Sequence, residues 1–115
     1  MDLLLERPDG QRCFVEIKNC TLVQGGVAYF PDAVTARGRK HLVELQAQVA
    51  LGHRSVNFFL IQRMDAGLFR PADHIDPAYG AELRTARDRG VELLVYDVHL
   101  NLQGIKLHTP VSCEL

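Results

Sequence analysis

Residues 2–18 read DLLLERPDGQRCFVEIK, and this stretch decides the predicted fold. Segments rich in apolar residues lie on both sides of Pro8-Asp9-Gly10, a sequence that is typical of a tight turn between two strands. We therefore predict a hairpin whose strands are Asp2 to Glu6 and Gln11 to Lys18.

The register of this hairpin follows from the length of its loop. A two-residue loop would pair Asp2 with Ile17, whereas a three-residue loop places Asp2 directly opposite Glu16 and keeps polar residues on one face. Lys18 shares that face, because residues two apart on a strand point the same way. We expect the apolar residues of the other face to be buried in the core; they are Leu3, Leu5, Cys13, Val15 and Ile17.

The polar face of the hairpin predicts a catalytic site. Directly opposed side chains have Cβ atoms about 5 Å apart, so the carboxylates of Asp2 and Glu16 would share one position. Mg²⁺ is commonly held by one or two carboxylates together with phosphate and water, and Mn²⁺ is the alternative ion. Lys18 would be the third catalytic residue, because an ammonium can orient a water or stabilise charge on a phosphate.

This pattern favours metal-assisted hydrolysis of phosphodiester bonds, with Asp2 and Glu16 as metal ligands. A solvated strand face with weak ion pairs between strands is the alternative interpretation, because exposed pairs of this kind contribute little to stability.

Beyond the hairpin, the chain alternates between strand and helix patterns. One helix begins at the N-cap Thr35 and ends before Gly52, and a second begins at Asp76-Pro77 and runs to about Arg89. The order ββββαβαββ predicts an α/β fold with one mixed β-sheet flanked by helices, partly with parallel strands. The further strands are predicted at Cys20 to Gln24, Val27 to Phe30, Val56 to Ile61, Val91 to His99 and Ile105 to His108.

The first helix carries a polar face opposite its apolar stripe. Its cations suit the phosphates of DNA, and we predict Arg37, Lys40 and His41 as DNA-binding residues. Glu44 would assist a metal as an accessory residue. An ordinary solvated helix face is the alternative. The residues of this face are Arg37, Lys40, His41, Glu44 and Gln48.

Two more candidates follow the strand that ends at Ile61. Polar residues at the carboxyl ends of strands in α/β sheets often line a binding crevice. We therefore predict Arg63 as a DNA contact and Gln62 as an accessory residue. The alternative is that both residues only begin a loop.

Composition limits the classes of function. The net charge of −1 and the pI of about 6.5 argue mildly against a simple nucleic-acid binder, so DNA binding would need locally clustered cations or a metal. The apolar runs are far shorter than the ~20 residues of a membrane helix, and no secretory leader opens the chain, so we expect a cytoplasmic protein without a membrane partner. Cys13, Cys20 and Cys113 form no C-x-x-C pair and are expected to be reduced.

Three segments carry a family resemblance. Residues 14–23, FVEIKNCTLV, resemble the E-[VI]-K-N-x-T-L segment of the sugar fermentation stimulation family. Residues 30–42, FPDAVTARGRKHL, resemble its F-P-D-A-x-T-x-R-G-x-K-H-L signature, and residues 61–65, IQRMD, resemble its Q-R-x-D element. The likeness covers nearly the whole chain.

The resemblance implies a restriction-endonuclease-like PD-(D/E)xK core over residues 1–115, with Asp2, Glu16 and Lys18 at its motif positions. It also implies binding to DNA without strong sequence preference, and regulation of maltose and other sugar metabolism. Members of the family carry an upstream domain similar to an oligonucleotide-binding barrel, which this chain lacks. We therefore expect a truncated protein whose DNA binding is weak or depends on that domain.

Three functional hypotheses remain. The first is a Mg²⁺-dependent nuclease, and the second is a non-catalytic module that only binds DNA. The third is a protein-interaction module that pairs with another chain, a homo-oligomer included.

Overall fold

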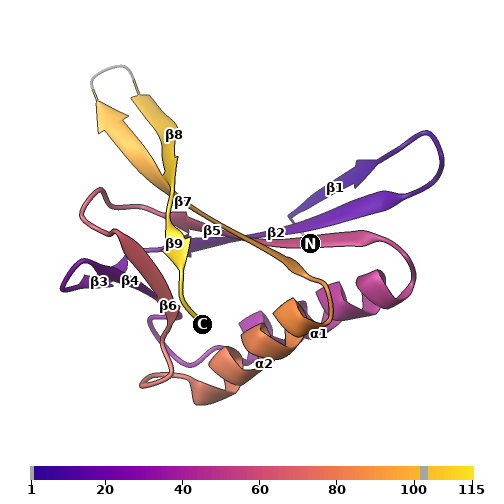
Figure 1. The fold of residues 1–115 in the computed structure, drawn as a ribbon, viewed down its shortest axis with the longest axis horizontal. Helices are drawn as coiled ribbons and strands as arrows, with labels where there is room; N and C mark the ends of the chain where they lie inside the picture. The colour runs from indigo at the N-terminus through magenta and orange to yellow at the C-terminus, as the bar shows by residue number, and fades with distance from the viewer. Residues whose placement is uncertain (1, 102–103) are drawn as a thin grey trace.

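The structure is a computed structural model that describes residues 2–101 and 104–115. Within these residues the strands form two sheets, one of five strands in the order β1-β2-β5-β7-β8 and one of four strands in the order β3-β4-β6-β9 (Figure 1). The elements are β1 (Leu3–Glu6), β2 (Arg12–Cys20), β3 (Leu22–Gln24), β4 (Val27–Phe30), α1 (Ala36–Ala50), β5 (Arg54–Ile61), β6 (Leu68–Pro71), α2 (Pro77–Asp88), β7 (Glu92–Asn101), β8 (Gly104–Pro110) and β9 (Ser112–Cys113).

The five-stranded sheet is mixed, as predicted. Its central strands β2, β5 and β7 are parallel, while β1 and β8 pair antiparallel at the two edges. Helices α1 and α2 pack against each other on one side of this sheet (Figure 1).

The prediction of a single sheet was wrong. Strand β6 lies in a segment that was expected to be a loop, and β9 was not predicted at all. Both strands are too short for an alternating pattern to stand out, with four and two residues. They become strands because β4 and β6 supply them with parallel partners, and this pairing depends on the tertiary fold.

The hairpin register is confirmed. Leu3 pairs with Val15 and Glu6 pairs with Arg12, and continuing this register by one residue places Asp2 opposite Glu16. The loop closes as expected for three residues, because the backbone N–H of Arg7 donates to the carbonyl of Gln11 at 2.8 Å.

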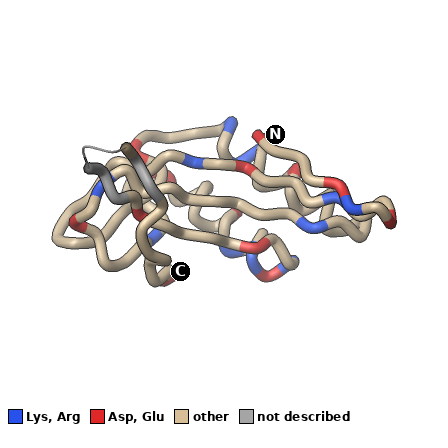
Figure 2. The backbone as a smooth tube through the Cα atoms, turned by 90° about the horizontal axis from the view of Figure 1, so that it is seen from above, with Lys and Arg blue, Asp and Glu red and all other residues tan. Residues whose placement is uncertain are grey.

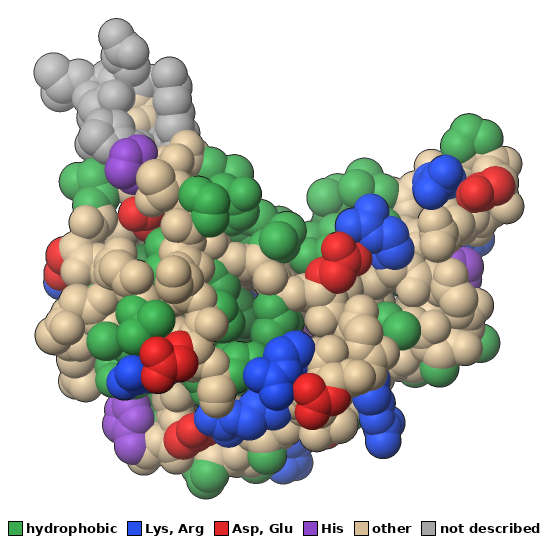
Figure 3. Space-filling model, in the orientation of Figure 1, with side chains coloured by type: hydrophobic (Ala, Val, Ile, Leu, Met, Phe, Trp, Pro, Cys, Tyr) green, Lys and Arg blue, Asp and Glu red, His purple; other side chains and the backbone are tan. Residues whose placement is uncertain are grey.

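The predicted core face of the hairpin was wrong. Leu3 and Ile17 are 45% and 41% exposed, whereas Glu16 on the opposite face is buried. Both faces of β2 carry apolar residues, so the alternation shows which residues share a face but not which face the helices cover. The exposed face, here called the outer face, carries hydrophobic side chains between the two projecting hairpins (Figure 3). Of its five residues that were predicted to be buried, Cys13 and Val15 are half-buried, and Leu3, Leu5 and Ile17 are exposed.

The core lies between the two helices and the inner surfaces of both sheets. Phe59 of β5 and Phe69 of β6 join the two sheets, with ring centroids 4.4 Å apart. A second aromatic pair joins a strand to a helix: the ring centroids of Phe30 in β4 and Tyr79 in α2 lie 5.3 Å apart. Aromatic pairs at such distances add to the stabilisation that burial provides.

The predicted helix ends are confirmed. The side chain of Thr35 accepts a hydrogen bond from the backbone N–H of Gly38 at 2.9 Å, and Asp76 accepts one from the N–H of Tyr79 at 3.0 Å. Gly90 follows α2 with a φ of 99°, a conformation that suits glycine. Across the described ranges, neither helix is both long and apolar enough to cross a membrane.

Charged residues of both signs are interspersed along the backbone (Figure 2). Many of them form exposed ion pairs, such as Arg54 with Glu92 across β5 and β7 and Arg70 with Glu114, each at 2.8 Å. Pairs of this kind contribute only about 0–1 kcal/mol each, so the buried groups of the inner face are of greater interest.

Candidate functional site

The inner face of β2 holds a compact cluster of ionisable side chains. Lys18 Nζ lies 3.1 Å from Glu16 Oε1 and 2.8 Å from His41 Nδ1, and His41 Nδ1 lies 2.9 Å from Glu16 Oε1. The side chain of Glu16 is 5% exposed and those of Lys18 and His41 are each 14% exposed. We refer to these three residues as the Glu16–Lys18–His41 cluster.

His41 belongs to α1, and the position of this helix places it in the cluster. The first turn of α1 lies close to α2, because Gly38 is buried against Thr35 and the ring of Tyr79. A Cβ atom at position 38 would lie 2.9 Å from Thr35 Cγ2 and 3.2 Å from the Tyr79 ring. Because Gly38 has no side chain, α1 can lie close to α2, and in this position α1 places His41 over β2.

Two buried polar side chains, those of Asn57 and Tyr79, lie beside the cluster. Asn57 of β5 pairs with Glu16 in the parallel register, and Asn57 and Tyr79 are both fully buried. Within the part of the chain that the structure describes, neither the Asn57 amide nor the Tyr79 hydroxyl has a hydrogen-bond partner in good geometry. Burial raises the pKa of Tyr79 above its usual value; the nearby Asn57 amide opposes this rise, and the charge of Glu16 adds to it.

Asp2 lies outside the cluster. Its register position is the predicted one, but its Oδ2 accepts a hydrogen bond from the backbone N–H of Ile17 at 2.7 Å, and the residue is exposed. Among residues 2–101 and 104–115, no group of three or more His, Cys, Asp or Glu side chains is placed to hold a metal ion. The structure therefore brings Glu16 and Lys18 together and leaves Asp2 at the edge of the sheet.

The predicted DNA contacts separate into two groups. Arg37, Lys40 and the accessory residue Glu44 are exposed on α1, whereas His41 points inward to the cluster. A signal for this existed in the sequence, because His41 directly precedes the buried Leu42 at the border of the apolar stripe.

The two predicted residues after β5 are exposed and engaged by neighbours. Gln62 Nε2 donates to Asn19 Oδ1 at 3.0 Å, and Arg63 Nε donates to Asp65 Oδ1 at 2.9 Å. Asn57 and Tyr79 were not predicted, although Asn57 stands out as the only polar residue in the apolar run 56–61.

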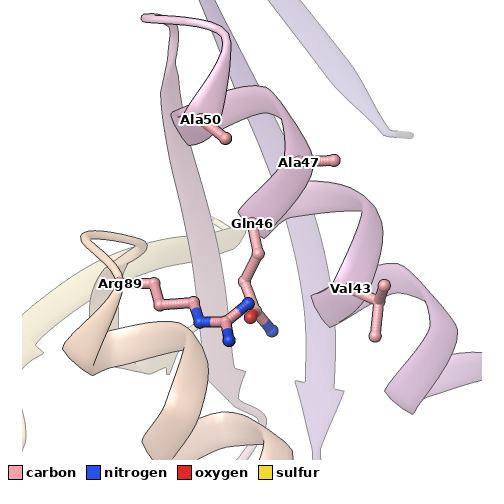
Figure 4. A pocket seen from close by; sticks show the side chains of 5 residues that line it. All are labelled: Val43, Gln46, Ala47, Ala50 and Arg89. Carbon is pink, nitrogen blue, oxygen red and sulfur yellow. The ribbon is translucent and has the colours of Figure 1, made fainter.

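A separate pocket of about 450 Å³ lies between α1 and α2 (Figure 4). It is lined by Val43, Gln46, Ala47, Ala50 and Arg89. Gln46 already donates to Glu82 Oε2 at 2.9 Å, and the lining includes no carboxylate or nucleophile. We therefore take the Glu16–Lys18–His41 cluster as the candidate site, because buried, converging ionisable groups are typical of functional sites.

Comparisons with known proteins point to one family. Residues 1–104 match the family model described as the sugar fermentation stimulation protein RE domain. A sugar fermentation stimulation protein homolog of Geotalea uraniireducens is 50% identical over 115 residues, which are 100% of this chain and 49% of the relative. The homolog of Pelobacter propionicus is 56% identical over 107 residues, which are 93% of this chain and 46% of the relative.

A solved structure has the same fold. The structure of Pyrococcus furiosus SfsA in complex with Ca²⁺ superimposes with a TM-score of 0.88 and 30% sequence identity, covering 97% of this chain and 48% of that chain. The match includes the two sheets and two helices described above. This chain thus spans about half the length of the relatives that it matches.

Proposed function

We propose, because this chain belongs to the sugar fermentation stimulation protein family, that it is a PD-(D/E)xK nuclease-like module that cleaves phosphodiester bonds of DNA. We further propose, on the basis of the family alone, that this protein acts in the cytoplasm in the regulation of sugar metabolism.

The observation that carries the nuclease proposal is the buried Glu16–Lys18 pair. Removing an ammonium and a carboxylate from water costs several kcal/mol per ion unless their partners compensate, so a fold does not gain much stability from such a pair. The pair also lies two residues apart on β2, as the E-x-K part of the motif requires. A catalytic role explains why a buried strand face would keep both charges.

The donor chemistry fits a magnesium ion. Asp2 and Glu16 present carboxylate oxygens at one register position of neighbouring strands, and hard cations prefer such ligands. The Ca²⁺ complex of the Pyrococcus furiosus relative supports a site of this type, since Ca²⁺ also takes oxygen ligands. A bound Mg²⁺ or Mn²⁺ would polarise the phosphate and activate a water.

The residues of this chain would supply the rest of the site. Asp2 and Glu16 would hold the ion through their carboxylates, while Glu16 also accepts a hydrogen bond from Lys18. Lys18 would stabilise charge that develops on the phosphate. The exposed cations Arg37, Lys40 and Arg63 would hold the DNA backbone, with Glu44 and Gln62 as accessory residues.

Cleavage of mixed single- and double-stranded DNA tests this proposal. We expect cutting in the presence of Mg²⁺ or Mn²⁺ that is lost in Lys18→Met and Glu16→Gln, while the exposed control Glu6→Gln cuts like wild type. Thermal melting of each variant shows whether it is folded. A folded wild-type protein that does not cut would rule out the nuclease and leave a DNA-binding module. A folded Lys18→Met that still cuts would rule out the catalytic role of Lys18.

The outer face supports a second candidate, a module that pairs with another copy of the chain. Parallel strands are normally covered on both faces, yet Ile17 of β2 and Leu94 of β7 are both 41% exposed. Phe58 of β5 lies between them in the register and stacks on Tyr96 of β7 with ring centroids 5.7 Å apart, which extends the apolar surface over three strands. Sedimentation over a range of concentrations tests this: a monomer at all concentrations excludes it, and association that Ile17→Lys abolishes supports it.

A further inference from the structure

We infer that His41 is a positioning residue for Lys18: its Nδ1 accepts a hydrogen bond from the Lys18 ammonium and holds it beside Glu16. The consequence for metal binding rests on the function proposed above, whereas the hydrogen bond itself does not. This role replaces the DNA contact that the sequence predicted for His41.

The geometry of the cluster limits His41 Nδ1 to one role. A neutral imidazole nitrogen either carries a proton and donates, or carries none and accepts, whereas the ammonium of Lys18 can only donate. His41 Nδ1 lies 2.8 Å from Lys18 Nζ and 2.9 Å from Glu16 Oε1, so it cannot satisfy both neighbours. Either it accepts from Lys18 or it donates to Glu16.

The hydrogen bonds that each arrangement allows decide between them. If Nδ1 carried a proton, two donors, Nδ1–H and the Lys18 ammonium, would face each other at 2.8 Å. A bare Nδ1 instead lies 2.9 Å from a second acceptor, Glu16 Oε1, with the ammonium within reach of both. If Nδ1 is bare, the Lys18 ammonium donates to both His41 Nδ1 and Glu16 Oε1, and it lies between the two acceptors as their common partner. The tautomer with its proton on Nε2 is therefore the one that fits.

A second acceptor keeps the Lys18 ammonium hydrogen-bonded when Glu16 binds a cation. The Lys18 side chain is only 14% exposed, and a buried charge that loses its partner is strongly destabilising. When a cation engages Glu16, Lys18 would lose part of its hydrogen bond to that carboxylate but keep the one to His41. His41 therefore allows Glu16 to bind a metal while Lys18 stays in place.

Nitrogen NMR of the imidazole tests the hydrogen bond without any metal. In ¹⁵N-labelled wild-type protein at mildly alkaline pH, we expect His41 in the Nε2–H tautomer. In Lys18→Met, Glu16 is the remaining partner of Nδ1, and the population should move towards the Nδ1–H tautomer. A wild-type His41 that is protonated on Nδ1, or a tautomer that does not respond to Lys18→Met, would overturn the inference.

Binding of Mn²⁺, measured by electron paramagnetic resonance, tests the consequence. Loss of an outer partner of a metal ligand typically weakens binding by about 10–100-fold. His41 acts one contact further out, through Lys18, so His41→Leu should lower the affinity towards the lower end of that range, by about 10-fold. His41→Asn should restore much of it, because the asparagine oxygen can accept from Lys18 in place of Nδ1.

A double-mutant cycle completes the test. In the Lys18→Met background no ammonium needs an acceptor and His41 can act only on Glu16 itself, so His41→Leu should not lower the Mn²⁺ affinity by the factor seen in wild type. An equal loss in both backgrounds would show that His41 acts independently of Lys18 and would contradict the inference. Absence of Mn²⁺ binding in wild type would instead remove the metal site of the proposed function, and the tautomer would still decide the role of His41.

Discussion

Asp76 Oδ2 accepts a hydrogen bond from the backbone N–H of Thr35 at 2.9 Å. Asp76 is the N-cap of α2, and Thr35 is the N-cap of α1, so one carboxylate joins the first turns of the two helices. This contact ties the start of α1, the helix that carries His41, to the start of α2.

The acid dependence of stability should reflect Asp76. The hydrogen bond from Thr35 is the largest influence on its pKa, which is lowered from the usual value with help from the N–H of Tyr79 and against the effect of burial. A carboxyl with a lowered folded pKa stabilises fully above its unfolded pKa of about 4, and the contribution is lost as pH falls through the folded pKa. Asp76→Ala should cost about 1–2 kcal/mol near neutral pH and flatten this decline.

Urea unfolding between neutral pH and about pH 2 measures this effect. Asp76→Asn separates the two hydrogen bonds, because asparagine can still cap Tyr79 with its oxygen but then presents an NH₂ group to Thr35. Its stability should lie between those of wild type and Asp76→Ala. The exposed Asp32→Ala serves as the control, and an Asp76→Asn variant as stable as wild type would show that the Thr35 bond contributes nothing.

Two glycines in the helices should respond differently to alanine. Ala favours a helix over Gly by about 1 kcal/mol. At Gly38 the added methyl would displace the capping Thr35 or the buried Tyr79, so we expect Gly38→Ala to destabilise by about 1–3 kcal/mol.

At Gly80 the obstacle is different, because the methyl would meet the carboxylate of Asp73, an exposed side chain that pairs with Arg84. That pair is worth about 0–1 kcal/mol, so Gly80→Ala should change stability by less than about 1 kcal/mol. Thermal unfolding of both variants checks this, and equal costs would mean that the approach of α1 to α2 is not tight at Gly38.

The buried amide of Asn57 should limit stability. A buried polar group without a partner costs about 1–3 kcal/mol, and in the described structure both amide atoms of Asn57 lack one. Asn57→Leu keeps the branching and the number of heavy atoms of the side chain and should raise the free energy of unfolding by about 1–2 kcal/mol. Chemical unfolding measures the change, with Tyr79→Phe as the companion that removes the other unpaired group. A clear loss of stability in Asn57→Leu would contradict the prediction.

The outer face should tolerate truncation that the core does not. Ile17 is 41% exposed, so Ile17→Ala should cost less than about 1 kcal/mol. Phe59 is fully buried between the two sheets, and Phe59→Ala should cost about 3–5 kcal/mol. Equilibrium unfolding of the two variants at low protein concentration compares these costs. A cost of several kcal/mol for Ile17→Ala would show that this face is covered in solution.

The sequence by itself determined the local features of this protein. Turn length set the hairpin register that places Asp2 opposite Glu16, and Thr35 and Asp76 marked the starts of both helices. These features depend on a few neighbouring residues, so rules for turns and caps are sufficient to predict them. Glu16 and Lys18 share a face for the same reason, since alternation along one strand is a local property.

Only the tertiary structure decided which face of β2 is buried and what lies against it. Phe14 and Cys20 on one face compete with Val15 and Ile17 on the other, and the packing of α1 and α2 resolves that competition. It also decided that His41 joins Lys18, a residue 23 positions away, while Asp2 stays at the sheet edge. Contacts of this kind depend on how helices pack on a sheet, which no local pattern encodes.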